Sequence, residues 1–331
     1  MYIMKALGLF SGGLDSALSA RMMKEFGLDV HVVYCCQPWQ EADLDKIQCI
    51  AEGVGAAFHV MNFGQDYFDM LLNPRHGYGK AFNPCIDCHR FMVRKAAGLM
   101  REIGAEFVFT GEVVGQRPMS QRKACLPLIE QETGLEGYLL RPLSARLLDP
   151  TLPEKNGWVD RRRFLALSGR GRRTQLALAK TYGIKDFLQP AGGCLLTDAH
   201  FGKCLKDFLS WDYHDPRESA AVKWGRYFRI NDDFIAIVGR DKRENELLIS
   251  HAYPEDHIIR MAEASGPFAL LKGKNPGEEI LSAAGGLVQR FSKSRNKKEE
   301  RIFYESVSDT GRKGHVTAVR VSDQDLKKME R

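Results

Sequence analysis

The sequence predicts an α/β domain built on a parallel sheet, followed by a smaller α+β domain. The chain of 331 residues exceeds the usual size of one compact domain. In its first half, short apolar runs alternate with helical patterns, which is typical of a parallel sheet covered by helices. From Val222 onward, short strands replace this alternation. We therefore expect a first domain at residues 1–208, a linker at 209–221 and a second domain at 222–331.

The elements of the first domain follow from apolar runs and their spacing. The apolar run at residues 3–10 predicts a buried first strand, and the helix expected at 16–26 places Ala17, Ala20 and Met23 on one face. Further strands are expected at 29–36, 57–63 and 105–111, and further helices at 41–54 and 88–103. Ligands of such sheets bind beyond the carboxyl ends of the strands, so the polar residues that follow the strands are site candidates.

The second domain begins after a polar break. The segment at 210–218 contains Pro216 and few apolar residues, which indicates a linker. Strands are then expected at 225–230, 233–239, 246–252, 266–273 and 302–307, with a helix at 278–290. The basic run KSRNKKEER lies between this helix and the last strand.

Composition excludes several classes of protein. No apolar run reaches about 18 residues, so no membrane span is expected. The N-terminus lacks the features of a signal peptide, and we expect a cytoplasmic protein. Eight cysteines are too few for a disulfide scaffold in a chain of this length, so a C-x-x-C pair indicates metal or sulfur chemistry. The net charge of +6 suggests an anionic partner.

The stretch SGGLDS directly after the first strand has the composition of a phosphate-binding turn. Gly12 and Gly13 let backbone N–H groups face an anion, and Ser11 and Ser16 supply hydroxyl donors. The following helix presents its positive N-terminus. Asp15 fits such a site if Mg²⁺ bridges its carboxylate to the phosphates. The alternative is a strand–turn–helix corner in which serine or aspartate caps the helix.

This stretch resembles the SGGxDS signature of the PP-loop (N-type) ATP pyrophosphatases. The resemblance implies an adenine nucleotide alpha hydrolase-like fold. It also implies that Ser11, Gly12, Gly13, Asp15 and Ser16 bind ATP, with Asp15 essential for catalysis. The expected reaction transfers AMP to a substrate and releases pyrophosphate.

Three cysteines narrow the resemblance to tRNA thiouridylases. NPCIDCHR, with Cys85 and Cys88, and PAGGCLLTD, with Cys194, resemble cysteine segments of the 2-thiouridylases. TGEVVGQ resembles a segment of the 4-thiouridine synthetases, which implies that Gly111 and Glu112 line the nucleotide or target-base pocket. Without that resemblance, this segment is a loop with a helix-capping acid. Together these likenesses span about the first 205 residues.

Two sulfur routes remain open. In one, Cys194 carries a persulfide and Cys88 resolves it by forming a disulfide. In the other, which Cys85 favours, the three cysteines bind a 4Fe-4S cluster and leave one iron free to hold sulfide. A Zn²⁺ site completed by His89, or inert packing of the thiols, is the alternative. The sulfur donor would be a cysteine desulfurase system or sulfide.

Basic residues suggest RNA as a partner, because guanidinium groups pair well with phosphates. Residues 222–320 resemble the RNA-binding NFACT-R module, and Tyr227 and Phe228 there are candidates to stack on bases, although Phe228 fits a core position better. The residues expected to contact RNA are Arg161, Arg162, Arg163, Arg170, Arg172, Arg173, Arg226, Arg240, Lys242 and Lys274.

The sequence thus favours an ATP-dependent uridine thiolase that acts on tRNA or another structured RNA. One alternative is an ATP pyrophosphatase that adenylates a small molecule. Another is a non-catalytic RNA-binding protein of translation control. The position of thiolation on the uridine ring stays open.

Overall fold

The computed structural model describes residues 3–189, 193–211, 215–308 and 312–331. The chain divides into two compact units, Met1–Thr197 and Asp198–Arg331, and each is described by itself. None of the helices within the described ranges combines the length and apolar character that crossing a bilayer requires.

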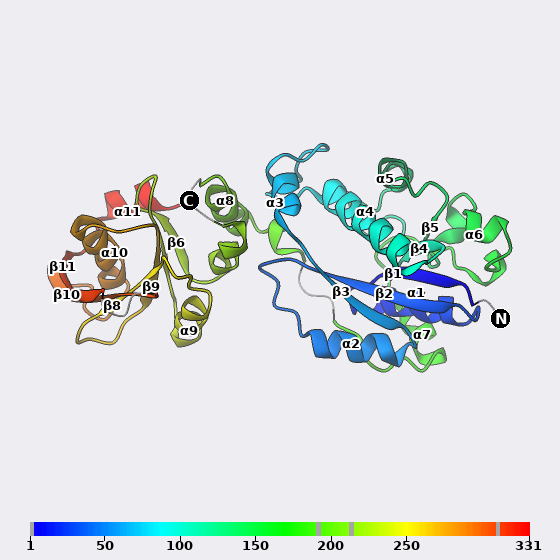
Figure 1. Cartoon of the computed structure of the whole chain (residues 1–331), viewed down its shortest axis with the longest axis horizontal. Coiled ribbons are helices and arrows are strands. Elements are labelled where there is room, and N and C mark those ends of the chain that lie inside the picture. The colour runs from blue at the N-terminus through cyan, green and yellow to red at the C-terminus, as the bar shows by residue number, and fades with distance from the viewer. Residues whose placement is uncertain (1–2, 190–192, 212–214, 309–311) are drawn as a thin grey trace. The chain divides into compact units, whose positions relative to one another are not determined.

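The first unit is a five-stranded parallel sheet with helices on both faces (Figure 1). Its strand order is β3-β2-β1-β4-β5, so β1 lies at the centre and pairs with β2 and β4. The strands are β1 (Lys5–Leu9), β2 (Asp29–Cys36), β3 (Ala57–Asn62), β4 (Phe107–Thr110) and β5 (Leu139–Leu140). The larger helices are α1 (Leu14–Lys24), α2 (Leu44–Gly53), α3 (Gln65–Leu72), α4 (Cys85–Ile103), α5 (Cys125–Thr133) and α7 (Arg173–Thr181). This arrangement confirms the predicted α/β class.

Alternation along β1 explains the two layers of helices. Ala6 belongs to the apolar cluster that contains α1, α2 and α7 residues, whereas Leu7 belongs to the cluster on the α4 side. Both residues are fully buried. Successive side chains of a strand point to opposite faces, so a strand buried on both sides needs an apolar residue at every position.

The second unit is a six-stranded antiparallel sheet that carries helix α10 (Glu278–Arg290). The strand order is β11-β10-β8-β9-β7-β6. The strands are β6 (Arg226–Arg229), β7 (Ile235–Val238), β8 (His257–Met261), β9 (Phe268–Lys272), β10 (Glu299–Ser306) and β11 (Lys313–Val319). Leu281, Ala284 and Leu287 of α10 pack into one core with Ile259 and Ile302 of the sheet. The α+β character is therefore as predicted, and α10 coincides with the helix expected at 278–290.

One predicted strand is wrong. Residues 246–250 of the expected strand at 246–252 belong to helix α9 (Lys242–Ser250) instead. The reason is local capping, because the Asp241 carboxylate accepts a hydrogen bond from the Glu244 amide at 2.9 Å. The apolar residues at its end resemble a strand in isolation, yet only Leu248 in this helix is buried. Strands β8 and β11 were not expected, since Arg260 interrupts the short apolar run of β8 and β11 contains few apolar residues.

The boundary between the units lies earlier than the predicted one after Phe208. Helix α8 (Ala199–Leu209) belongs to the second unit, and the predicted linker contains a 3-10 helix (Pro216–Lys223) that packs on α8. The Asp207 carboxylate of α8 accepts hydrogen bonds from Tyr227 Oη at 2.6 Å and Arg229 Nε at 2.9 Å. These contacts tie α8 to β6, which sequence periodicity does not reveal.

Candidate functional site

The turn after β1 places hydroxyl and amide groups at the N-terminus of α1. Gly12 adopts a positive φ of 71°, which favours glycine. Ser16 Oγ donates to the Gly13 carbonyl at 2.8 Å, and Ser11 Oγ lies 3.3 Å from Ser16 Oγ. Gly13 is the N-cap of α1 and supplies no side chain to satisfy its first amides. The turn therefore presents backbone donors at a helix start, as an anion site requires.

Asp15 has one carboxylate oxygen engaged and one that is not. Its Oδ2 accepts a hydrogen bond from Gln116 Nε2 at 2.8 Å. Its Oδ1 is buried and has no hydrogen-bond partner among the described residues. An orphaned buried carboxylate oxygen beside a phosphate-binding turn is a suitable ligand for a hard cation, so the site fits Mg²⁺.

Gly111 brings the end of β4 against the same turn. A Cβ atom at this position would lie 2.6 Å from the Asp15 carbonyl carbon and 2.6 Å from the Ser16 amide nitrogen. Both are backbone atoms, so they cannot rotate out of the way. Glycine is thus required for the close approach that puts the loop after β4 next to Asp15.

Glu112 lies in a buried ion cluster and not at the turn. Its two oxygens pair with Arg141 Nε at 2.9 Å and with His89 Nδ1 at 3.0 Å. Burial alone would raise the pKa of Glu112, but Arg141 and His89 outweigh it and lower this pKa to about 2. Arg141 also pairs with Glu130. With both of its oxygens engaged, Glu112 joins the segment after β4 to α4 and to Arg141. The sequence analysis did not select Arg141.

Cys85 and Cys88 occupy the first turn of α4. Asn83 Nδ2 donates to Cys85 Sγ at 3.3 Å, and Tyr67 Oη lies 3.6 Å from Cys88 Sγ. Cys88 as a whole is partly exposed, but its thiol is surrounded by protein, and this burial raises the pKa of Cys88 to about 12. Proximity to Cys194 and Cys85 raises it further, so the structure brings the three predicted cysteines together.

Cys194 reaches the cluster on a segment that is anchored beside the SGGLDS turn. The Leu188 amide donates to the Gly12 carbonyl at 2.7 Å. Residues 190–192, which complete the predicted PAGGC motif, lie outside the described residues. Burial raises the pKa of Cys194, and nearby Cys85 adds to this increase.

Gln116 and Arg117 connect the two halves of the site. Gln116 binds Asp15, as described above. The Arg117 guanidinium lies close enough to Cys88 and Cys194 to lower the pKa of each thiol, although burial has the larger, opposite effect. Two consecutive residues thus join the turn to the thiols. Gln116 belongs to the TGEVVGQ motif, but nothing in the sequence indicated Arg117.

Cys35, at the end of β2, is a further thiol near Cys88. Burial raises the pKa of Cys35 to about 12, and Cys88 and Cys36 contribute. Gln37, two residues further on, donates to Tyr67 Oη at 3.0 Å. The end of β2 thus lies beside the thiol cluster.

The donor set distinguishes between the metal alternatives. Across the described residues, no group of three or more His, Cys, Asp or Glu side chains is placed to hold a single metal ion. His89 is engaged by Glu112, so the zinc site that would use it has no support. Three gathered thiols, one with an amide donor on its sulfur, are the donor chemistry of an iron–sulfur cluster, and these residues fit that group.

The arginines of residues 161–173 do not form one continuous basic surface. Arg161 pairs with Glu154 at 2.6 Å, and Arg162 pairs with Asp160 at 2.9 Å. The guanidinium of Arg163 lies 4.4 Å from the ring centre of Phe26. Both acids, Glu154 and Asp160, come from outside residues 161–173. No ion pair is recorded within the described ranges for Arg170, Arg172 and Arg173.

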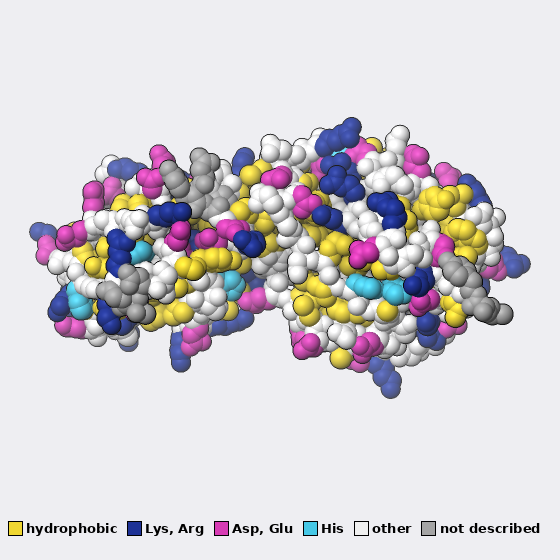
Figure 2. Space-filling view, in the orientation of Figure 1, with side chains coloured by type: hydrophobic (Ala, Val, Ile, Leu, Met, Phe, Trp, Pro, Cys, Tyr) yellow, Lys and Arg dark blue, Asp and Glu magenta, His cyan; other side chains and the backbone are white. Residues whose placement is uncertain are grey.

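In the second unit, the residues predicted to contact RNA have different surroundings. Lys242 is 93% exposed and lies 3.8 Å from Glu246 on the same helix, whereas Arg226 is half-buried over the ring of Phe291 at 4.4 Å. Two others pair with acids at the surface, Arg240 with Glu244 at 3.0 Å and Lys274 with Glu255 at 3.3 Å. Figure 2 shows basic and acidic side chains interspersed on the visible face.

The expected stacking of Tyr227 on bases is wrong. This side chain is only 3% exposed, and its hydroxyl donates to Asp207. Phe228 is 1% exposed and belongs to the core, as the sequence analysis preferred.

Comparison with known proteins finds a separate family model for each unit. Residues 3–146 match the family model described as Thiamine biosynthesis protein (ThiI). Residues 225–329 match the model described as NFACT protein RNA binding domain. The first unit is thus similar to the ThiI model and the second unit to the NFACT RNA-binding model.

Curated relatives are similar over longer stretches. The chain is 22% identical over 283 residues to the tRNA-specific 2-thiouridylase MnmA of Limosilactobacillus fermentum, covering 75% of this chain and 72% of that protein. It is 25% identical over 283 residues to the protein of the same name from Pseudomonas paraeruginosa, covering 77% and 73%. With the one from Proteus mirabilis, the match is 27% identical over 157 residues, covering 43% and 42%.

Two solved structures of thiolation enzymes are similar with TM-scores below 0.4. One is a 4-thiouridine synthetase in complex with RNA and bound ATP, at 20% identity, covering 54% of this chain and 41% of that one, with a TM-score of 0.39. The other is the U34-tRNA thiolase NcsA from Methanococcus maripaludis with its 4Fe-4S cluster, at 16% identity, covering 58% and 62%, with a TM-score of 0.32.

Proposed function

We propose that this protein is an ATP-dependent tRNA uridine thiolase. The observation that carries the proposal is the link from Asp15 through Gln116 and Arg117 to the thiols of Cys88 and Cys194. The SGGLDS turn and the thiols can serve one reaction only if both reach the same substrate. The link through Gln116 and Arg117 supports this, because it joins the turn to the thiols. The names of the curated relatives and the RNA-binding domain support RNA as that substrate.

The chemistry has two steps. The uridine carbonyl oxygen attacks the α-phosphorus of ATP, and the bond to pyrophosphate breaks. A sulfur nucleophile then attacks the ring carbon that carries this oxygen, and the carbon–oxygen bond breaks as AMP leaves. The amides and hydroxyls of the SGGLDS turn would hold the phosphates, and Asp15 would hold Mg²⁺, which neutralises charge on them.

For the second step, the raised pKa values favour the cluster route over the persulfide route. A thiol whose pKa is about 12 is almost wholly protonated at neutral pH, so it is a poor free nucleophile. A coordinating metal deprotonates such a thiol outright. Cys85, Cys88 and Cys194 would hold the cluster, which would supply an iron site for sulfide. The sulfur donor would be a desulfurase system or sulfide.

Nucleoside analysis tests the reaction class. Mass spectrometry of nucleosides from the tRNA of a strain lacking the gene is expected to show loss of one thiolated uridine. Whether the lost nucleoside is the 2-thio or the 4-thio isomer identifies the position of thiolation on the ring. Complementation with the wild-type gene should restore it, and complementation with Asp15→Asn should not. An unchanged nucleoside profile in the deletion strain would contradict the proposal and favour a small-molecule substrate.

The first step is tested separately with purified protein. We expect ATP to be converted into AMP and pyrophosphate only when substrate RNA is added. Asp15→Asn should lower this rate at least about a hundredfold, because it removes the charge of the proposed Mg²⁺ ligand. Asp45→Asn, on the exposed face of α2, is the matched control and should keep the full rate.

A further inference from the structure

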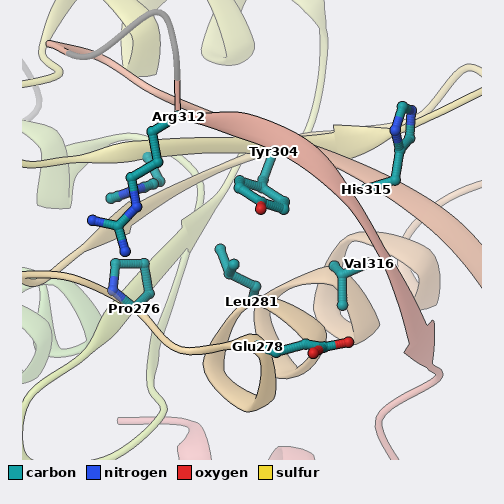
Figure 3. Close-up of a pocket in the computed structure, with 8 residues that line it drawn as sticks. Pro276, Glu278, Leu281, Tyr304, Arg312, His315 and Val316 are labelled. Atoms are coloured by element: carbon teal, nitrogen blue, oxygen red, sulfur yellow. The ribbon is translucent and has the colours of Figure 1, made fainter.

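The second unit contains a cavity of about 270 Å³ that the proposed reaction does not use. Its walls come from β8, β10, β11 and the start of α10 (Figure 3). Small-molecule sites commonly measure about 300–1,000 Å³, so this cavity lies just below that range and suits only a small ligand. A single nucleotide unit is of that order, whereas a base-paired segment is far too large.

His257 is a buried polar side chain that lines the cavity. It is 3% exposed, and neither ring nitrogen makes a hydrogen bond of standard geometry within the described residues. Burial lowers the pKa of His257, and Arg312 lowers it further, while the backbone of Glu255 acts weakly in the opposite direction. The imidazole is therefore neutral at physiological pH, with one donor and one acceptor for a ligand. Buried polar groups in proteins rarely stay unpaired.

The cavity also has a cationic end. Arg312 lines it and donates to Asn275 Oδ1 at 2.7 Å, which orients the guanidinium. A guanidinium has five N–H donors and matches the geometry of a phosphate group. Helix α10 begins at the cavity with Gly277 as its N-cap, and no side chain caps its first amides. Arg312 and this helix start both favour a negatively charged ligand group.

The apolar side chains of a mostly polar lining include Tyr304 and Leu281. Figure 3 shows the Tyr304 ring and Leu281 between Arg312 and Pro276 on one side and Glu278 on the other. An aromatic ring facing apolar side chains provides a stacking surface for a base. The Glu278 carboxylate would repel a second anion, but it can accept hydrogen bonds from sugar hydroxyls or base amino groups.

We propose that this cavity binds one unpaired RNA nucleotide, with its phosphate on Arg312 and His257 and its base against Tyr304. The cationic end suits the phosphate, Tyr304 suits the base, and the Glu278 carboxylate suits an amino group at the edge of that base. The inference rests on the proposed function only in taking RNA as the ligand. The same chemistry is present in a free nucleotide such as AMP, so the experiment must separate the two sources.

Fluorescence anisotropy with the full chain tests the cavity. The probes are a labelled single-stranded octaribonucleotide and a labelled blunt RNA hairpin, each titrated at fixed salt, with AMP as competitor. We expect Arg312→Gln to weaken binding of the single strand about tenfold and that of the hairpin about twofold. Lys313→Gln is the matched control, because it removes a neighbouring exposed charge of β11 that does not line the cavity. Lys313→Gln should weaken the binding of both RNA probes about twofold.

Each other outcome overturns the proposal. If Arg312→Gln and Lys313→Gln weaken single-strand binding equally, the RNA is held by general electrostatic attraction and not by a nucleotide site. Tight AMP binding that Arg312→Gln abolishes, with single-strand affinity unchanged, would assign the cavity to a free nucleotide. If the chain binds RNA and Arg312→Gln does not change the affinity, the nucleotide site in the cavity is rejected and the proposed function is not affected. Absence of any RNA binding by the wild-type chain would reject the proposed function as well.

Discussion

At the scale of single residues, the space around Gly111 is the sharpest constraint in the site. A side chain here would meet the backbone of Asp15 and Ser16, so the approach of β4 to the SGGLDS turn depends on one missing methyl group. Glycine at this position has no positive φ to explain it. Its role is therefore close packing of two backbone segments and not an unusual conformation.

Gly111→Ala is expected to destabilise the protein by about 1–3 kcal/mol, because backbone must shift to accept the new methyl group. It should also lower AMP formation, since Asp15 and Gln116 would move apart. Urea unfolding and the RNA-dependent ATP assay measure these effects. Gly98→Ala is the control. Nothing lies within 4 Å of its added Cβ, and Gly98 is inside helix α4, so stability should rise by about 0.5–1 kcal/mol.

At the scale of elements, the buried ion cluster around Glu112 joins α4, the segment after β4 and Arg141. Arg141 is 2% exposed, and a buried guanidinium without its carboxylate is costly. We expect Glu112→Gln to destabilise the protein by about 2–3 kcal/mol at pH 7, with Glu130 keeping part of the pairing. Urea unfolding midpoints compared with those of the wild type measure this difference.

The same cluster predicts a pH dependence. The pKa of Glu112 is lowered to about 2 from its usual 4.5, so the folded state binds fewer protons than the unfolded state between these values. Its contribution is fully present above about pH 4.5 and is lost as the pH falls toward 2. The difference between wild type and Glu112→Gln should therefore shrink between pH 5 and pH 3. A constant difference would contradict the lowered pKa. Glu52→Gln, at the exposed surface of α2, should match the wild type throughout.

The first turn of α4 and the segment after Leu188 together carry the proposed cluster ligands. Anaerobically purified protein is expected to absorb broadly near 400 nm and to contain about four irons per chain. Cys85→Ala, Cys88→Ala and Cys194→Ala should each lose most of this iron, because each removes one of three thiolates. Cys49→Ala, at an exposed position of α2, should retain it. If all three variants keep the wild-type iron content, the proposal of an iron–sulfur cluster is wrong and the persulfide route remains.

At the scale of the whole molecule, α8 determines where the second unit begins. Asp207 on this helix binds Tyr227, Arg229 and Arg331, all within that unit. A fragment from residue 198 to 331 is therefore expected to fold cooperatively. A fragment from 222 to 331, which follows the predicted boundary, lacks α8 and leaves buried Tyr227 and Arg229 without their carboxylate. It should melt at a clearly lower temperature or aggregate, and equal melting of the two fragments would contradict this role of α8.

The sequence by itself determined the parallel-sheet class, the SGGLDS turn and the three cysteines, because these features depend on local spacing. Strand–turn–helix chemistry is contained within a few neighbouring residues, and so is the first turn of α4. The helix at 278–290 was likewise predicted from its apolar spacing alone.

Only the tertiary structure decided which distant groups meet. It placed Glu112 against Arg141 and His89, linked Asp15 to the thiols through Gln116 and Arg117, and gave Arg161 and Arg162 acidic partners from outside their stretch. It also made α9 a helix, through the Asp241 cap, and assigned α8 to the second unit. The physical reason is the same in each case: pairing and burial depend on neighbours in space, and spacing along the chain specifies those neighbours only within one or two turns.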